Sequence, residues 1–75
     1  MGTTYVNPPE KCDLCGRKFE QVSVMYDANL RGIGWCNCCH SCFQANKGTL
    51  GVGRGQKYQK QDNNSWLCVK GGMGC

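Results

Sequence analysis

The sequence predicts a small α+β domain that is stabilised by a bound metal, and three observations lead to this prediction. The chain has 75 residues, and a core of that size stabilises a fold only marginally without a metal or disulfides. Apolar residues make up 40% of the chain, and this fraction includes its eight cysteines, so little remains for an ordinary hydrophobic interior. Four of the cysteines form two C-x-x-C steps about 20 residues apart, which is the spacing of a four-thiolate zinc site.

The chain is long enough for one domain, which we expect over residues 11–70. Residues 1–10 are expected to form a flexible leader, and residues 71–75 a flexible tail. The leader has neither the basic start nor the apolar stretch of a signal peptide, and no apolar run approaches the length of a membrane span. We therefore expect the protein in a reducing cytoplasm, where zinc is favoured. Four disulfides are the alternative in an oxidising compartment.

The first half of the chain is expected to form a zinc knuckle followed by a β-hairpin. A tight turn is expected from Cys12 to Gly16, because glycine can adopt a positive φ at little energetic cost. Residues 19–26 alternate between apolar and polar side chains, which predicts a strand. The turn-like residues 27–32 precede a short returning strand over 33–37, so the hairpin lies between the two cysteine pairs.

The second half is expected to begin with a short helix over residues 42–47 that stops at Gly48. A glycine-rich loop continues to residue 55. The remaining expected elements are an extended polar segment, a turn and a final strand, over residues 56–61, 62–65 and 66–70. The predicted fold is thus zinc-ribbon or treble-clef-like, with a knuckle, a β-hairpin, a second knuckle with a short helix, and a C-terminal loop and strand.

The expected cofactor is one structural Zn²⁺, held by Cys12, Cys15, Cys39 and Cys42. Cys39 and Cys42 are favoured as the second pair because they would lie at the start of the short helix, where the helix dipole favours thiolates. Phe43 would then follow directly and could pack beneath the site. The alternative second pair is Cys36 and Cys39, since Cys36 to Cys39 resembles the C-N-x-C step of single-zinc treble-clef DNA-binding fingers.

The favoured pairing leaves four cysteines without a metal. Cys36 and Cys38 are expected to be buried as small hydrophobic residues, and a second metal or a redox role is their alternative. Cys68 lies in an apolar strand pattern and is expected in the core, whereas Cys75 is expected to be a free thiol in the tail. His40 lies inside the second knuckle and is expected to be exposed to solvent.

The chemistry expected at this site is structural, and we expect no enzyme. A shell of four thiolates is closed, whereas catalytic zinc keeps an open position for water. The chain has one histidine, and its acidic residues are scattered, so no nucleophile–base pair accompanies the cysteines.

The excess of basic over acidic residues lies entirely in the second half of the chain. The formal net charge is +4: residues 1–42 sum to zero, and residues 43–75 contain five basic residues against one acidic residue. The candidate nucleic-acid or partner-binding residues are Lys47, Arg54, Lys57, Tyr58 and Lys60. The cations could contact phosphates, and Tyr58 could stack on a base. The alternative is that the glycines of this segment let it pack closely over the zinc lobe. The segment has neither a P-loop nor a dinucleotide motif.

Several short motifs follow one another in a fixed order between residues 12 and 70. They are Cys12-x-x-Cys15-Gly16, Tyr26-Asp27-Ala28 with Arg31, Gly32-Ile33-Gly34-Trp35, Cys39-x-x-Cys42-Phe43, the segment 51–58, and Trp66. In this order they resemble a group of small zinc-finger proteins encoded by tailed bacteriophages. Members of that group usually lack cysteine at the positions of Cys36 and Cys38, which supports Cys39 and Cys42 as ligands. The resemblance implies no particular activity, and it implies the host cytoplasm as the location.

Three classes of function are compatible with these features. The favoured one is a non-catalytic zinc-binding adaptor that binds DNA or RNA through the basic glycine-rich segment. The alternative is a protein–protein interaction module that acts on a host or phage protein. The second alternative is a redox or metal-handling protein that uses the surplus thiols. We expect no membrane partner and favour a monomer.

Overall fold

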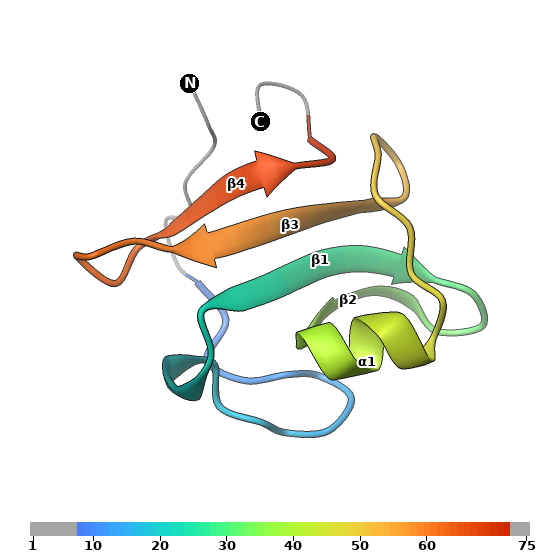
Figure 1. Cartoon of the computed structure of the whole chain (residues 1–75). Helices are drawn as coiled ribbons and strands as arrows, with labels where there is room; N and C mark the ends of the chain where they lie inside the picture. The colour runs from blue at the N-terminus through green and yellow to red at the C-terminus, as the bar shows by residue number, and fades with distance from the viewer. Residues whose placement is uncertain (1–7, 73–75) are drawn as a thin grey trace.

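The computed structural model describes residues 8–72, which form a four-stranded antiparallel sheet, one short α-helix and one turn of 3-10 helix (Figure 1). The elements are η1 (Phe19–Gln21), β1 (Val24–Leu30), β2 (Gly34–Cys38), α1 (His40–Ala45), β3 (Gly55–Lys60) and β4 (Trp66–Lys70). This is the expected α+β class. Most of the expected leader and tail, residues 1–7 and 73–75, lies outside the described residues. No helix in the described part is long and apolar enough to cross a bilayer.

The strand order is β2-β1-β3-β4, so β1 has a partner on each side. The prediction of a strand over 19–26 and a turn over 27–32 is wrong, because residues 19–21 form η1 and β1 continues to Leu30. Asp27 and Asn29 are turn formers by local preference. They lie in a strand here because β1 pairs with β2 and β3 and thereby buries Ala28 completely, and such pairing overrides local propensity. The turn itself is confined to residues 31–33.

The side of the sheet that carries α1 is held together by two stacked aromatic rings. The rings of Tyr26 on β1 and Phe43 on α1 lie 4.0 Å apart with an interplanar angle of 12°. Tyr26 is 3% exposed and Phe43 is 8% exposed, so this pair joins the helix to the sheet. Burial of two aromatic side chains is a large share of the hydrophobic stabilisation available to so small a domain.

The opposite side of the sheet has its own small core, because consecutive strand residues face opposite sides. Met25 on β1 pairs with Tyr58 on β3, and both are buried. Phe19 from η1 packs edge-on against Trp66 of β4, with the ring centroids 6.1 Å apart. Lys60 covers this pair: its Nζ lies 5.2 Å from the centre of the Trp66 ring and donates a hydrogen bond of 2.9 Å to the carbonyl of Phe19.

Helix α1 ends earlier than expected, at Ala45 instead of residue 47, and it ends in a Schellman motif. The N–H of Lys47 donates to the carbonyl of Gln44 at 3.0 Å, and the N–H of Gly48 donates to the carbonyl of Phe43 at 2.8 Å. The left-handed residue of this motif is usually glycine, but here it is Lys47, with φ of 54°. Gly48 follows it and lies directly against the Phe43 ring.

We expect the substitution Gly48→Ala to destabilise the fold by about 1–3 kcal/mol, the usual cost of overpacking. A Cβ at this position would overlap the Phe43 ring, and that ring cannot move freely because it stacks on Tyr26. Chemical denaturation of the zinc-bound protein measures the change in the free energy of unfolding. The double variant Gly48→Ala, Phe43→Leu should lose less than the sum of the two single changes. Strict additivity would show that the ring is not the obstacle.

Candidate metal centre

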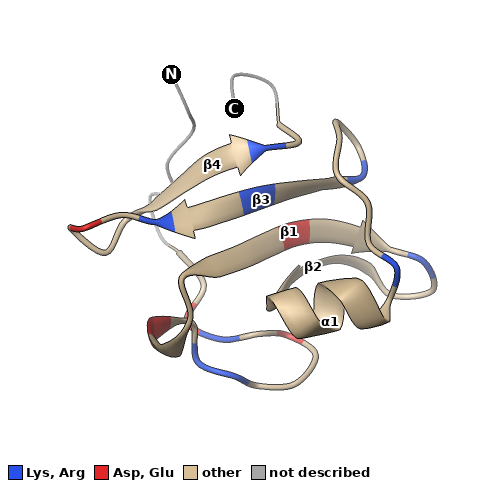
Figure 2. Ribbon diagram, in the orientation of Figure 1, with Lys and Arg blue, Asp and Glu red and all other residues tan. Residues whose placement is uncertain are grey.

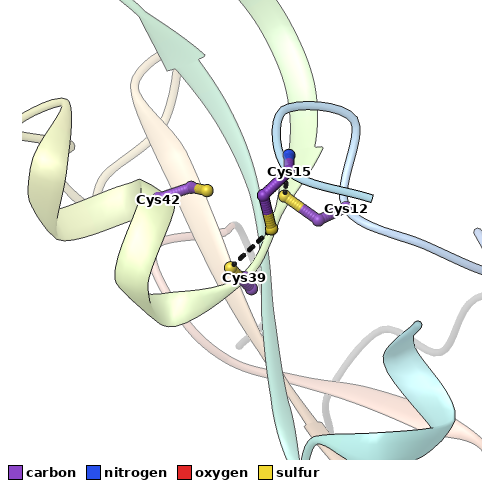
Figure 3. Close-up of side chains that lie close together, drawn as sticks. All are labelled: Cys12, Cys15, Cys39 and Cys42. Atoms are coloured by element: carbon purple, nitrogen blue, oxygen red, sulfur yellow. Dashed lines mark hydrogen bonds between the residues drawn. The ribbon is translucent and has the colours of Figure 1, made fainter. Parts of the chain in front are cut away.

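Four cysteines from two distant segments meet at one point of the structure (Figure 3). The Sγ atoms of Cys12, Cys15, Cys39 and Cys42 all lie within 4.8 Å of one another, and those of Cys15 and Cys39 are 3.7 Å apart. Zn–S bonds of about 2.3 Å in a tetrahedron place the sulfurs about 3.8 Å from each other. The donor set and its spacing therefore fit one metal ion, with zinc as the natural occupant of a four-thiolate shell.

The first cysteine pair is positioned by a tight knuckle between residues 11 and 18, which are joined by an isolated β-bridge. The N–H of Cys12 donates to the carbonyl of Arg17 at 2.8 Å, and the N–H of Gly16 donates to the carbonyl of Cys12 at 3.0 Å. Gly16 has φ of 79°, the positive value expected for it. The N–H groups of Leu14 and Cys15 point at the Cys12 sulfur, at 3.4 Å and 3.5 Å.

The second pair is positioned by the start of α1. Cys39 is the N-cap residue, with extended φ and ψ of −78° and 169°, and Cys42 lies one turn later. The N–H of Phe43 donates to the carbonyl of Cys39 at 2.9 Å, which closes the first helical turn. Two side chains three positions apart on a helical turn lie on the same side, so both sulfurs face the knuckle.

Asp13 and Asn37 join the knuckle to strand β2, a role that the residue pattern did not predict for either of them. The N–H of Asp13 donates to the carbonyl of Asn37, and the N–H of Asn37 donates to Oδ2 of Asp13, each at 2.8 Å. This reciprocal pair brings Cys12 beside Cys39. The only sign of this pair in the sequence is the aspartate directly after the first cysteine, and an aspartate at that position is equally typical of an ordinary turn.

Cys36 and Cys38 lie on β2, outside the four-cysteine group. They pair with Ala28 and Tyr26 of β1 and are 8% and 0% exposed, as expected for small hydrophobic residues. Burial, reinforced by the neighbouring thiols, raises the pKa of Cys38 to about 12, so this group stays a neutral thiol at neutral pH. The structure thus assembles Cys39 with Cys42 and leaves Cys36 in the sheet.

Cys68 differs from the expectation of a surplus thiol. It is buried, as predicted for a core residue of the last strand, but it is disulfide-bonded. It is therefore unavailable as a metal ligand or as a reactive thiol. Cys75 lies outside the described residues.

The protonation of the cluster is uneven before a metal binds. Burial acts to raise the pKa of Cys12, but hydrogen bonds from the backbones of Cys15, Cys39 and Leu14 outweigh it and lower this pKa to about 6. Burial and hydrogen bonds with the neighbouring thiols raise the pKa of Cys42. The backbone hydrogen bonds thus favour the thiolate form of Cys12, and the charge of a bound metal would favour loss of the proton from Cys42.

His40 lies beside the cluster but belongs to a different contact. Its side chain is exposed, as expected, and its Nδ1 lies 2.9 Å from the hydroxyl of Tyr26, within hydrogen-bonding distance. The ring centroids of the two side chains are 5.8 Å apart. His40 thus extends the aromatic pair of Tyr26 and Phe43 toward solvent.

The five candidate binding residues do not form one surface. Lys47 and Lys57 line the same hollow between α1 and the sheet. Lys60 lies over Trp66 on the opposite side, and Arg54 is exposed in the turn before β3. Tyr58 is 8% exposed, so it faces the core and presents no ring for base stacking.

Lys70 also lines this hollow, although it was not among the binding residues predicted from the sequence. It pairs with Lys57 across β3 and β4, and this neighbourhood depends on strand register, which the sequence pattern does not show. Figure 2 shows basic residues on β3, at the end of β4 and on the segment after α1. Three segments that are separate in the sequence thus contribute cations to one region.

Comparisons of the chain with protein-family models, with curated proteins and with solved structures found no match.

Proposed function

We propose that the protein is a non-catalytic zinc-binding adaptor, of treble-clef-like construction, that binds DNA or RNA. The main support for this proposal is that Lys47, Lys57 and Lys70 line one hollow. No aspartate or glutamate is among its lining residues. Cations grouped in this way are electrostatically complementary to a phosphate backbone. The metal would supply the stability that keeps the three segments together.

This surface can contact the phosphates of a nucleic acid, but it has no groups placed to recognise individual bases. Lysine ammonium groups neutralise phosphates in any sequence, whereas base stacking needs an exposed aromatic face. The aromatic rings next to the lysines, Tyr26 and Phe43, are buried against each other. The proposal is therefore binding with strong salt dependence and little sequence preference.

A structural role for the metal also supports the proposal. The four cysteine sulfurs would complete the shell of one bound ion, which would leave no position for a catalytic water. The resemblance of the motif order to bacteriophage zinc-finger proteins agrees with an adaptor acting in a host cytoplasm.

We expect fluorescently labelled single-stranded and double-stranded oligonucleotides of DNA and RNA to bind the zinc-loaded protein, and the affinity to fall with salt. Three phosphate contacts predict a slope of log K against log salt of about −2 for single strands and about −3 for duplexes. Fluorescence anisotropy measures this slope. A chain that binds none of these probes even at low salt would remove the proposal.

Protein binding is the second candidate, because one edge of the sheet exposes large apolar side chains. Trp35 on the edge strand β2 is 52% exposed, and Ile33 in the preceding turn is 46% exposed. A partner captured from host lysate that is insensitive to nuclease and is lost in Trp35→Ala would favour this function over nucleic-acid binding.

A further inference from the structure

A hollow of about 460 Å³ lies between α1, the segment that follows it and the neighbouring strands of the sheet. Its walls come from five elements or segments: β1, α1, the chain after α1, β3 and β4. The lining residues are Tyr26, His40, Phe43, Gln44, Lys47, Gly48, Leu50, Lys57 and Lys70. The zinc cluster does not line it. The hollow is thus a separate site whose function the metal centre does not explain.

The charges in this hollow are unbalanced. Its three ionic side chains are all lysines, and the acidic residue of β1, Asp27, alternates to the other side of that strand. There burial, and after it the charge of Asp27, raises the pKa of Tyr58. Lys57 and Lys70 are directly opposed on adjacent strands. Like charges in opposed positions destabilise a sheet, so this pair is unfavourable unless an anion lies between the ammonium groups.

Lys47 adds a second unfavourable feature at the same place. It occupies the left-handed position of the Schellman motif, with φ of 54°, where glycine would be less strained. The two helix carbonyls of this motif accept hydrogen bonds from the N–H groups of Lys47 and Gly48, so they do not present free negative ends to the hollow. The strained residue is thus also the third cation of the hollow. Backbone strain of this kind is typical of binding sites.

We propose that this hollow is a phosphate-binding pocket in which Lys47, Lys57 and Lys70 each contact a phosphate of a nucleic-acid backbone. The inference rests on the proposed function, and it locates that function at one site. The buried rings of Tyr26 and Phe43 form an apolar floor, and His40 at the rim offers a polar ring to the same backbone. Lysines from three segments thus face the nucleic-acid backbone, and each contributes as a mobile point charge.

The test compares the wild-type protein with Lys47→Gln, Lys57→Gln, Lys70→Gln and the triple variant, all loaded with zinc. Each single change should reduce the magnitude of the salt slope for a single-stranded oligonucleotide by about 0.7, and the triple change by about 2. Arg31→Gln is the matched control, since it removes one exposed cation from the turn between β1 and β2. Its slope should stay at the wild-type value.

Lys47→Gly separates binding from folding. Glycine relieves the left-handed strain, so the melting temperature should rise or stay equal while the salt slope falls. Asn64→Gly is the control for strain, because Asn64 has φ of 65° and lies outside the hollow. That variant should gain stability without any loss of binding. If Lys47→Gly keeps the wild-type slope, the pocket is wrong.

A titration with inorganic phosphate, followed by two-dimensional ¹H–¹⁵N spectra, separates the pocket from the wider proposal. Chemical-shift changes that are confined to residues of the hollow, with phosphate and with oligonucleotide, would support both the pocket and nucleic-acid binding. Oligonucleotide binding that survives the triple change overturns the pocket and leaves nucleic-acid binding in place. Shifts with phosphate but no binding of any oligonucleotide retain a phosphate site and overturn its nucleic-acid source. No shift with either probe overturns both.

Discussion

Removal of the metal with a strong chelator is expected to unfold the protein. Structural zinc in small domains contributes on the order of 10 kcal/mol of folding free energy at neutral pH, which is comparable to the entire stability of a typical domain. The four-cysteine group joins the knuckle to α1, and its sulfurs would be left as a crowded set of thiols without the ion. Far-UV circular dichroism should show loss of the sheet signal, and metal analysis of the native protein should give one zinc per chain.

The control for this experiment is restoration of the native spectrum when excess zinc is added under reducing conditions. Cobalt substitution gives a second readout, because tetrahedral thiolate coordination produces characteristic absorption bands. A spectrum that stays native after complete metal removal would show that the sheet and its two aromatic clusters are sufficient, and the metal would then be dispensable for folding.

The second large effect is expected from Cys42→Ser, compared with Cys36→Ser. Loss of Cys42 leaves three thiolates on the metal, so zinc affinity should fall by orders of magnitude and the domain should unfold at low zinc concentration. Cys36→Ser should keep one zinc per chain. It should cost about 1–3 kcal/mol of stability, because a hydroxyl then replaces a thiol that is 8% exposed in the sheet.

Competition with a chromophoric chelator measures both affinities, and Cys39→Ser serves as the positive control because both pairings use Cys39. The reverse result, with zinc lost in Cys36→Ser and retained in Cys42→Ser, would establish Cys36 and Cys39 as the second pair. Equal loss in both variants would indicate that the two cysteines exchange at the metal.

The metal centre and the lysine hollow are connected through α1. Cys39 and Cys42 hold the start of the helix, Phe43 stacks on Tyr26, and the chain then turns at Lys47 into the wall of the hollow. Loss of zinc should therefore remove the proposed nucleic-acid binding even though none of the four cysteines lines the hollow. This dependence gives the metal a role in binding without any direct contact.

The surroundings of Cys36 and Cys38 argue against a redox function. Both thiols are buried, and burial raises the pKa of each above its usual value. A reactive cysteine needs the opposite environment, with exposure and a stabilised thiolate.

The parts of the structure that the sequence determined by itself are those governed by local geometry. The C-x-x-C spacing brings two sulfurs together within a turn, and Gly16 meets the positive φ that this turn requires. The apolar run before Lys70 predicted the last strand with its observed bounds of 66–70. In each case the decisive contacts lie a few residues apart, so the residue pattern contains the necessary information.

Contacts between distant segments decided the rest. Tyr58 was predicted to face a nucleic acid and is buried, because the pairing of β3 with β1 places it opposite Met25. Lys70 lies beside Lys57 only through the register of β4. A shift of one residue in a strand moves every side chain to the other face, so side-chain orientation is a property of the assembled sheet. The sequence therefore identified the four-cysteine group, whereas the tertiary structure determined which cations could act together.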